Sequence, residues 1–287
     1  RKLENRRGIL MFFGNKMSYT QKKLCTFATH KDKPSLYKDN MTKKAIVMGA
    51  TSGIGMEVAK LLAAKGWQVG IAGRRIERLQ ALTAEGIACY QQIDVTSADA
   101  PHLLQQLIDK LGGMDLYFHS SGIGWQNNLL DIEKELKTVE TNGMGFTRMV
   151  DTAFNWFAAH TTTTENKDTY RIACITSIAG TKGLGAAPAY SATKRFQNHY
   201  LECLAQQARM RQLPISITDL RPGFVATDLI AGSKYPLQLR AEEVARHIVH
   251  AIEKGKEVKV IDWRYAILVF FWRHIPRWLW TRLKISQ

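Results

Sequence analysis

The chain has 287 residues, 45% of them hydrophobic, and a formal net charge of +15, which suits a globular protein with one large domain or two small ones. The charge gathers at the two ends, because residues 1–41 carry +7, residues 263–287 carry +5, and the 221 residues between them carry only +3. A near-neutral body speaks against nucleic acid as a partner, whereas basic ends suit an anionic membrane or another polyanion, or serve solubility.

The four cysteines lie far apart and show neither metal-ligand nor Cys-x-x-Cys spacing. We interpret them as reduced structural thiols of a reducing compartment, and we expect a cytoplasmic protein without a bound metal. Residues 1–41 are polar and show little periodicity, which predicts a basic, disordered N-terminal extension. Their one apolar run, residues 9–13, is too short for a signal-peptide core or a membrane span.

From residue 44 onward, short apolar segments alternate with helical patterns. The expected strands are residues 45–48, 69–72, 88–93, 114–119, 171–176, 215–220 and 258–261. The expected helices are one that ends near residue 65, followed by residues 75–84, 98–111, 136–160, 189–211 and 242–253, with a surface loop over residues 161–166. Such alternation predicts parallel βαβ units with right-handed crossovers. We therefore expect an α/β fold: one doubly wound domain over residues 42–262, with a seven-stranded parallel sheet and helices on both faces.

The first strand is followed by the segment Gly49-Ala50-Thr51-Ser52-Gly53-Ile54-Gly55, directly before a helix. Glycines let the backbone turn tightly and approach a pyrophosphate, and the helix N-terminus supplies free N–H groups and positive potential. Although such a loop can be only a tight turn, its position at the first strand–helix junction predicts nucleotide binding. Its spacing is GxxxGxG rather than the GxGxxG of most dinucleotide-binding enzymes.

Two arginines stand where an enzyme that uses NAD carries an acid, at the end of the second strand. Arg74 and Arg75 follow Gly73 there. A guanidinium binds a 2′-phosphate that a carboxylate would repel, so these residues favour NADP(H) over NAD(H). The alternative is that the arginines merely begin an exposed helix. Asp94, in the pair Asp94-Val95 that ends the third strand, is placed to meet the adenine amino group.

Tyr190 and Lys194 lie four residues apart, on one face of an expected helix. A free phenol has a pKa of about 10 and exchanges protons poorly at neutral pH. A neighbouring ammonium favours the phenolate, so we expect Lys194 to lower the pKa of Tyr190 and make it a general acid or base. Ser177, at the end of a buried strand, is placed to hold a substrate oxygen against the tyrosine. Taken alone, the same spacing also describes two exposed helix residues.

Together these features resemble the short-chain dehydrogenase/reductase family over residues 43–262. The likeness is carried by the order and spacing of the glycine loop, Asp94-Val95, Asn142, Ser177, the Tyr190/Lys194 pair and the segment Pro222-Gly223-Phe224-Val225-Ala226-Thr227. The resemblance implies a Rossmann-type fold and NAD(P)-dependent hydride transfer between a carbinol and a carbonyl. Members commonly pair through the helices around residues 138–160 and 189–211, which implies a homodimer or homotetramer.

The resemblance gives catalytic roles to Asn142, Ser177, Tyr190 and Lys194. It implies that Tyr190 is the general acid/base, that Lys194 lowers its pKa and binds the nicotinamide ribose, and that Ser177 orients the substrate carbonyl. Asn142, in a kinked helix, would hold a water of the proton relay. The residues and the resemblance together give this cofactor-binding set: Gly49, Thr51, Ser52, Gly53, Ile54, Gly55, Arg74, Arg75, Asp94, Val95, Ser121, Gly122, Tyr190, Lys194, Pro222, Gly223, Val225 and Thr227.

Two motifs depart from the family pattern. Met48-Gly49 stands where the family often has Thr-Gly, and His119-Ser120-Ser121-Gly122 stands where it has Asn-Asn-Ala-Gly. Neither departure removes a catalytic group, and we interpret His119 as a structural residue at a strand end.

Residues 263–287 form an aromatic, basic C-terminal tail with four tryptophans and no acidic residue. The unbroken apolar run from Tyr265 to Trp272 is much shorter than the ~20 residues that span a bilayer, and Pro276 would interrupt a longer helix. Tryptophans flanked by arginines suit a water–lipid interface, so residues 263–282 are a candidate for peripheral membrane contact. The alternative is a cap packed on the body or on a partner subunit.

The sequence therefore predicts an NADP(H)-dependent oxidoreductase that interconverts a carbonyl and a secondary alcohol, with Tyr190 as the general acid/base. The segment between Thr227 and Glu242, where the family has a substrate lid, is short. Together with the apolar C-terminal tail, this short segment suggests an apolar substrate. Two alternatives stay open: a 3-oxoacyl-thioester reductase of fatty-acid type, and a non-catalytic NADP-binding or scaffold protein.

Overall fold

A computed structural model of the chain describes residues 42–161, 170–228, 235 and 237–283. All the described residues belong to one compact unit, which begins at Thr42. The predicted disordered extension therefore lies outside the described residues. So do Cys25 and all but the first residue of the expected loop 161–166.

Seven parallel strands form one sheet in the order β3-β2-β1-β4-β5-β6-β9, which confirms the predicted fold class. The strands are β1 (Lys44–Met48), β2 (Gln68–Gly73), β3 (Cys89–Gln92), β4 (Leu116–His119), β5 (Tyr170–Ile175), β6 (Ile215–Arg221) and β9 (Val258–Val260). A separate parallel pair joins β7 (Val225–Ala226) to β8 (Leu239–Arg240) beside the sheet's carboxyl edge. This small pair was not expected from the sequence, because two-residue strands leave no periodic pattern.

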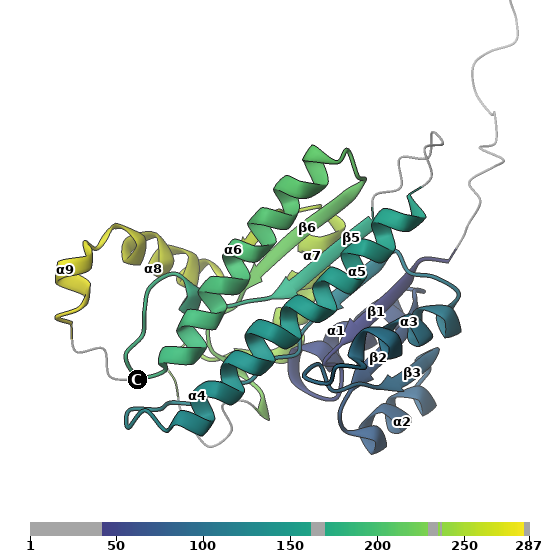
Figure 1. Cartoon of the computed structure of the whole chain (residues 1–287), viewed down its shortest axis with the longest axis horizontal. Helices are drawn as coiled ribbons and strands as arrows, with labels where there is room; N and C mark the ends of the chain where they lie inside the picture. The colour runs from purple at the N-terminus through teal and green to yellow at the C-terminus, as the bar shows by residue number, and fades with distance from the viewer. Residues whose placement is uncertain (1–41, 162–169, 229–234, 236, 284–287) are drawn as a thin grey trace, which may run out of the picture. The chain divides into compact units, whose positions relative to one another are not determined.

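Helices follow nearly every strand (Figure 1). They are α1 (Gly53–Ala64), α2 (Ile76–Ala84), α3 (Ala100–Leu111), α4 (Ile132–Val139), the π-helix η1 (Glu140–Gly145), α5 (Phe146–His160), the 3₁₀ turn η2 (Ile178–Gly180), α6 (Pro188–Met210), α7 (Ala241–Glu253), α8 (Trp263–His274) and α9 (Arg277–Trp280). The expected single helix over residues 136–160 is thus wrong in detail. It begins earlier and is interrupted by η1, and the kink expected at Asn142 is a π-turn.

Two apolar layers cover the sheet. One layer packs side chains of α1, α2 and α7 against one face, with Val58, Leu62 and Ile248 almost fully buried. The other packs α3, α5 and α6 against the opposite face, with Phe146, Phe154 and Phe157 almost fully buried. Figure 1 shows α5 and α6 side by side across one face, with α7 and α1 behind the strands. The inner strands are mostly buried on both faces, which explains their largely apolar sequences, whereas the edge strands β3 and β9 are partly exposed.

The strand order reverses between β1 and β4, because β2 and β3 extend the sheet on one side and β5, β6 and β9 on the other. In open α/β sheets a ligand crevice lies outside the carboxyl ends of the strands at this switch point. The glycine loop leaves β1 there, and residues 120–124 leave β4 beside it. The topology therefore brings together segments that are far apart in the sequence.

The tail folds into α8 and α9, drawn in yellow in Figure 1, and the two helices are separated at Ile275 and Pro276 as expected from the proline. Asp262 caps α8, since its carboxylate accepts a hydrogen bond from the Arg264 N–H at 2.8 Å. Tyr265 and Val269 enter the same apolar layer as α1 and α7. In the described parts of the chain, every helix is too short or too polar to span a bilayer.

Candidate active site

The glycine loop has the shape of an anion cradle. Gly49 and Gly53 have φ values of +87° and +55°, a region that favours glycine. A Cβ at Gly55 would lie 2.2 Å from the Gly49 carbonyl oxygen, so helix and strand meet too closely for any side chain there. Ser52 begins α1 without capping it through its side chain, which leaves the first N–H groups of the helix for a ligand. These residues fit the pyrophosphate of a dinucleotide.

Arg75 lies over this cradle. Its guanidinium donates to Thr51 Oγ1 at 2.9 Å and to Ser52 Oγ at 2.6 Å, and it forms an ion pair with Asp228 at 2.9 Å. Arg78 adds a second contact with the Asp228 carboxylate at 3.1 Å and one with the Thr51 carbonyl at 3.3 Å. The Arg75 and Arg78 hydrogen bonds come first among the causes that hold the pKa of Asp228 below its ordinary value. Arg74 is exposed beside them. Three guanidinium groups therefore gather beside the glycine loop, two of them paired with the Asp228 carboxylate.

The ends of β3 and β4 complete the cofactor side. Burial acts to raise the pKa of Asp94, but hydrogen bonds from Thr96 and the charge of Arg74 lower it, so the carboxylate is ionised. The Val95 side chain is buried against Gly145, which leaves only its main chain to face a ligand. Ser121 packs closely against the glycine loop, because its backbone N atom lies 2.6 Å from the position that a Cβ at Gly49 would take.

Asn142 is fully buried in η1 and ties the loop after β4 to the helix. Its Oδ1 accepts from the Ile123 N–H at 2.9 Å, and its Nδ2 donates to the Ile123 carbonyl at 2.7 Å and to Thr193 Oγ1 at 3.2 Å. Its own carbonyl accepts from Gln197 Nε2 at 2.9 Å. The π-turn thus aims the amide at a loop backbone, and the water-holding role of Asn142 stays a prediction.

The Ser177 hydroxyl, at the end of β5, lies near the phenol of Tyr190 at the start of α6. The Tyr190 ring lies flat against Gly124, where a Cβ would be 2.3 Å from Cδ2. Burial raises the pKa of Tyr190 above its ordinary value, and the Ser177 hydrogen bond opposes this rise. The phenol therefore holds its proton at neutral pH.

Lys194 is buried one turn further along α6, with its Nζ 5.7 Å from the Tyr190 ring centre. The ammonium donates to the Ile175 carbonyl at 3.1 Å and to Gln197 Oε1 at 2.9 Å. Burial lowers the pKa of Lys194 to about 8, although the nearby Asp219 and Cys174 act to raise it. We expected Lys194 to lower the pKa of Tyr190, and this prediction is wrong. Burial raises the pKa of the phenol, and the Lys194 ammonium donates its hydrogen bonds to the Ile175 carbonyl and Gln197 instead.

A buried carboxylate lies beneath the lysine. Asp219 of β6 accepts from the Thr176 hydroxyl at 2.5 Å, from Asn198 Nδ2 at 3.0 Å and from Arg221 Nε at 2.8 Å. These three partners satisfy its hydrogen-bonding capacity in the core, and the carboxylate acts to raise the pKa of Lys194.

The 222–227 segment lies on the far side of the crevice. The Pro222 carbonyl accepts from the Ile178 N–H at 3.1 Å, which joins this segment to the loop after Ser177. Thr227 touches the glycine loop, since its Cγ2 lies 2.8 Å from the position of a Cβ at Gly53. Val225 is buried in β7 and faces the core rather than the crevice. Gly122 lies between Asn142 and Lys194.

Residues 43–235 of the sequence match the family model described as short chain dehydrogenase. The chain belongs to the short-chain dehydrogenase family. It is 30% identical over 233 residues to an uncharacterized oxidoreductase of Myxococcus xanthus, covering 78% of this chain and 89% of the relative. It is 27% identical over 268 residues to the mouse dehydrogenase/reductase SDR family member 7B, covering 84% of this chain and 80% of that protein.

The fold agrees with solved structures of the family. An actinorhodin polyketide ketoreductase with NADPH superposes with a TM-score of 0.66 at 24% identity, covering 77% of this chain and 95% of that one. As a short-chain dehydrogenase the chain is an oxidoreductase, and the family uses NAD(P)(H) with small carbonyl or alcohol substrates.

Four site residues were missed in the sequence analysis. Arg78 could have been found from its spacing, because it lies one helical turn beyond Arg74 and Arg75. Gln197 lies one turn beyond Lys194 and carries the same signal. Gly124 and Asp219 carried no local signal, because their roles depend on contacts with distant segments.

His119, which replaces the first asparagine of the family motif, is fully buried at the end of β4. Its Nδ1 and the Tyr117 hydroxyl share a hydrogen bond at 2.9 Å. Burial lowers the pKa of His119 to about 3, so the ring is neutral. These facts agree with the structural role expected for it.

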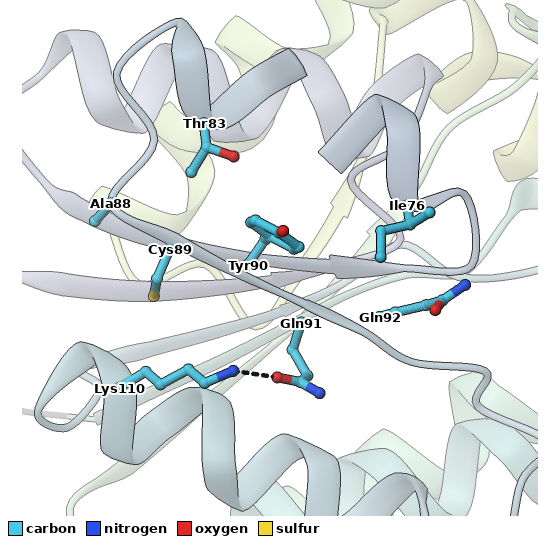
Figure 2. A pocket seen from close by; sticks show the side chains of 8 residues that line it. All are labelled: Ile76, Thr83, Ala88, Cys89, Tyr90, Gln91, Gln92 and Lys110. Carbon is cyan, nitrogen blue, oxygen red and sulfur yellow. Dashed lines mark hydrogen bonds between the residues drawn. The ribbon is translucent and has the colours of Figure 1, made fainter. Parts of the chain in front are cut away.

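One hollow of the described residues lies away from this site. It measures about 520 Å³ and lies beside the edge strand β3, between α2 and α3. Figure 2 shows Tyr90 and the hydrogen-bonded pair Gln91–Lys110 at its lining, with no residue of the candidate active site. Within the part of the chain that the structure describes, no three acidic, histidine or cysteine side chains gather as a metal site.

Proposed function

We propose that the chain is an NADP(H)-dependent oxidoreductase that interconverts a carbonyl and a secondary alcohol, with Tyr190 as the general acid/base. The observation that carries the proposal is that the buried Ser177 hydroxyl lies near the Tyr190 phenol and that the buried Lys194 Nζ lies 5.7 Å from the Tyr190 ring centre, at the carboxyl end of the sheet where the glycine loop begins. Two hydroxyls that converge on one point can polarise a carbonyl oxygen as negative charge develops on it.

The raised pKa of Tyr190 favours the reductive direction, because reduction needs a protonated phenol. A bound NADPH supplies the hydride that reaches the carbonyl carbon. Tyr190 gives its proton to the carbonyl oxygen, and Ser177 hydrogen-bonds the same oxygen while charge forms. Lys194, held by Ile175 and Gln197, stabilises the phenolate that remains.

The preference for NADP(H) is supported by Arg74, Arg75 and Arg78 beside the glycine loop. Arg74→Ala and Arg75→Ala should each weaken NADPH binding by about tenfold or more and leave NADH binding nearly unchanged, since only NADPH carries the 2′-phosphate. Arg246→Ala, on the exposed side of α7, serves as a matched control. Equal losses for both cofactors would contradict the preference.

For the substrate we propose an apolar ketone or the matching secondary alcohol. NADPH oxidation should be measured at 340 nm with a series of apolar ketones and with 3-oxoacyl thioesters. We expect turnover with the ketones. Turnover with thioesters alone would instead identify an acyl-thioester reductase, and tight NADPH binding without any turnover would identify a non-catalytic NADP-binding protein.

We further propose a cytoplasmic enzyme that touches anionic lipid surfaces through α8 and α9. Trp263, Phe270, Phe271 and Trp278 are 59–70% exposed there, and residues 263–282 hold four arginines and no acidic residue. Aromatic rings with cationic neighbours suit the headgroup region. Sedimentation with phosphatidylcholine vesicles, with and without 30% phosphatidylserine, should show binding that Phe270→Ser reduces and Leu129→Ser does not. Equal partitioning of all three proteins would contradict the proposal.

Self-association through α5 and α6 is also proposed. Phe196 and Met210 are 43% and 77% exposed on α6, beside a hollow of about 360 Å³ lined by residues of both helices. Analytical ultracentrifugation should show a dimer or tetramer that Phe196→Glu shifts toward monomer. A monomeric wild-type protein would contradict it.

A further inference from the structure

We propose that α8 and α9 are a working part of the active site: Tyr265 positions the loop at Gly223 and Phe224 that faces the cofactor, and Trp280 forms an apolar wall beside Tyr190. This inference rests on the proposed function and adds to it the origin of substrate selectivity. The inference depends on two contacts that buried side chains of the tail make with the body, one by Tyr265 and one by Trp280.

The first contact is made by Tyr265, whose ring is 2% exposed. Its hydroxyl accepts from the Phe224 N–H at 3.2 Å and donates to the Leu237 carbonyl at 3.0 Å. A Cβ at Gly223 would lie 2.2 Å from Cζ of Tyr265, so the loop backbone lies directly on the ring. Leu237 has a φ of +59°, a costly conformation for leucine that a fixed partner helps to hold.

Tyr265 therefore joins the two ends of one connection. The segment after β6 and the segment that leads into β8 pair with each other, and the tyrosine hydroxyl bridges them. Without the hydroxyl, the Phe224 N–H and the Leu237 carbonyl would each lose this partner. We infer that the loop that faces the cofactor keeps its position through a side chain of the tail.

The second contact is made by Trp280, which is 7% exposed. Its Nε1–H donates to the Gly183 carbonyl at 2.7 Å, and Lys182 Nζ donates to the Ile275 carbonyl at 2.7 Å. Trp280 packs with Ala179 and Leu184, and the apolar cluster that they form also meets Tyr190, Trp272 and Ile275.

Gly183 and its neighbours lie between Ser177 and Tyr190 in the sequence, so α9 holds the connection between the two catalytic hydroxyls. The cluster beside Tyr190 consists of apolar side chains and indole rings. Such a wall favours a substrate whose carbonyl bears an apolar group on that side, because a polar group would lose its water there.

The cofactor half is tested with Tyr265→Phe, which keeps the ring and removes both hydrogen bonds. NADPH affinity is measured by fluorescence titration in the full-length protein. We expect about tenfold weaker binding, the change that corresponds to one net hydrogen bond. Tyr170→Phe is the matched control, because its hydroxyl also donates to a backbone carbonyl, at 3.0 Å, but at the opposite end of the sheet. Equal affinity in both variants would overturn this half.

The substrate half is tested with Trp280→Phe and, as its control in the same short helix, Trp278→Phe, since Trp278 is 63% exposed. We expect Trp280→Phe to raise KM for apolar ketones by about tenfold, with a smaller change in kcat and unchanged NADPH affinity. Hydrogen exchange of the amides of residues 181–187 should also become faster in this variant alone. If Trp280→Phe leaves the exchange of these amides slow and KM unchanged, the proposal that Trp280 forms an apolar wall beside Tyr190 is wrong.

The outcomes separate this inference from the proposed function. A wild-type protein that oxidises NADPH with none of the carbonyl compounds would refute the proposed function, while NADPH affinity and hydrogen exchange would still decide both contacts. A wild-type protein with turnover whose Tyr265 and Trp280 variants match their controls would refute the inference alone.

Discussion

Gly124→Ala should damage catalysis without removing the cofactor. The backbone at Gly124 lies outside the left-handed region, so an alanine is compatible with its conformation. The new Cβ, however, would lie 2.3 Å from Cδ2 and 2.9 Å from Cγ of Tyr190. Ordinary carbon–carbon contacts are about 3.5–4.0 Å, so the ring or the loop has to move by roughly 1 Å.

A displacement of about 1 Å at a catalytic group costs on the order of 100-fold in rate. We therefore expect kcat to fall about 100-fold in steady-state NADPH oxidation, while NADPH affinity stays within about twofold because the glycine loop is untouched. Gly185→Ala is the matched control, since a Cβ there meets nothing within 4 Å. A Gly124→Ala enzyme with the kcat of Gly185→Ala would refute the placement of Tyr190 against this loop.

Three further predictions concern Lys194. Burial lowers its pKa to about 8, so turnover should fall as the pH rises through about 8 and the ammonium loses its proton. In the unfolded chain the lysine keeps its proton up to its ordinary pKa of 10.5, so between pH 8 and 10.5 the unfolded state binds more protons than the folded state. The free energy of unfolding of the wild type should therefore rise with pH in this range relative to that of Lys194→Met. Parallel urea titrations of the two proteins measure this difference. Gln197→Leu removes the amide between Lys194 and the Asn142 carbonyl, and it should cost about 1–3 kcal/mol of stability in the same titrations. Unchanged stability would show that Gln197 does not hold the lysine.

Much of the site could be predicted from the sequence because its residues follow strand ends. The glycine loop, Asp94, Ser177 and Pro222 each come at or just after the end of a strand, and parallel strands bring their carboxyl ends to one edge. The pattern of apolar segments was therefore enough to place these segments at one crevice.

The parts that could not be predicted depend on packing between distant segments. The π-turn around Asn142 shows no break in helical periodicity, because a π-bulge changes the hydrogen-bond register without changing residue types. The contact of Gly124 with Tyr190 depends on how two loops approach each other. The sequence left two roles open for the aromatic tail. Its buried residues Tyr265 and Trp280 show that the tail packs on the body, and contact with a membrane stays a prediction.

The electrostatic argument was the least predictable. A Tyr–Lys pair in water would lower the pKa of the phenol, but in the folded chain burial acts on both groups. It raises the pKa of Tyr190 and lowers that of Lys194, and the ammonium is shared between Ile175 and Gln197. The result favours a phenol that donates its proton.

The central claim is that the Tyr190 hydroxyl delivers the proton during carbonyl reduction. Its most direct test is Tyr190→Phe, assayed for NADPH affinity by fluorescence and for single-turnover reduction of an apolar ketone. The account predicts wild-type NADPH affinity and a rate lower by about 100- to 10,000-fold, the usual contribution of a general acid. A rate close to that of the wild type would contradict it.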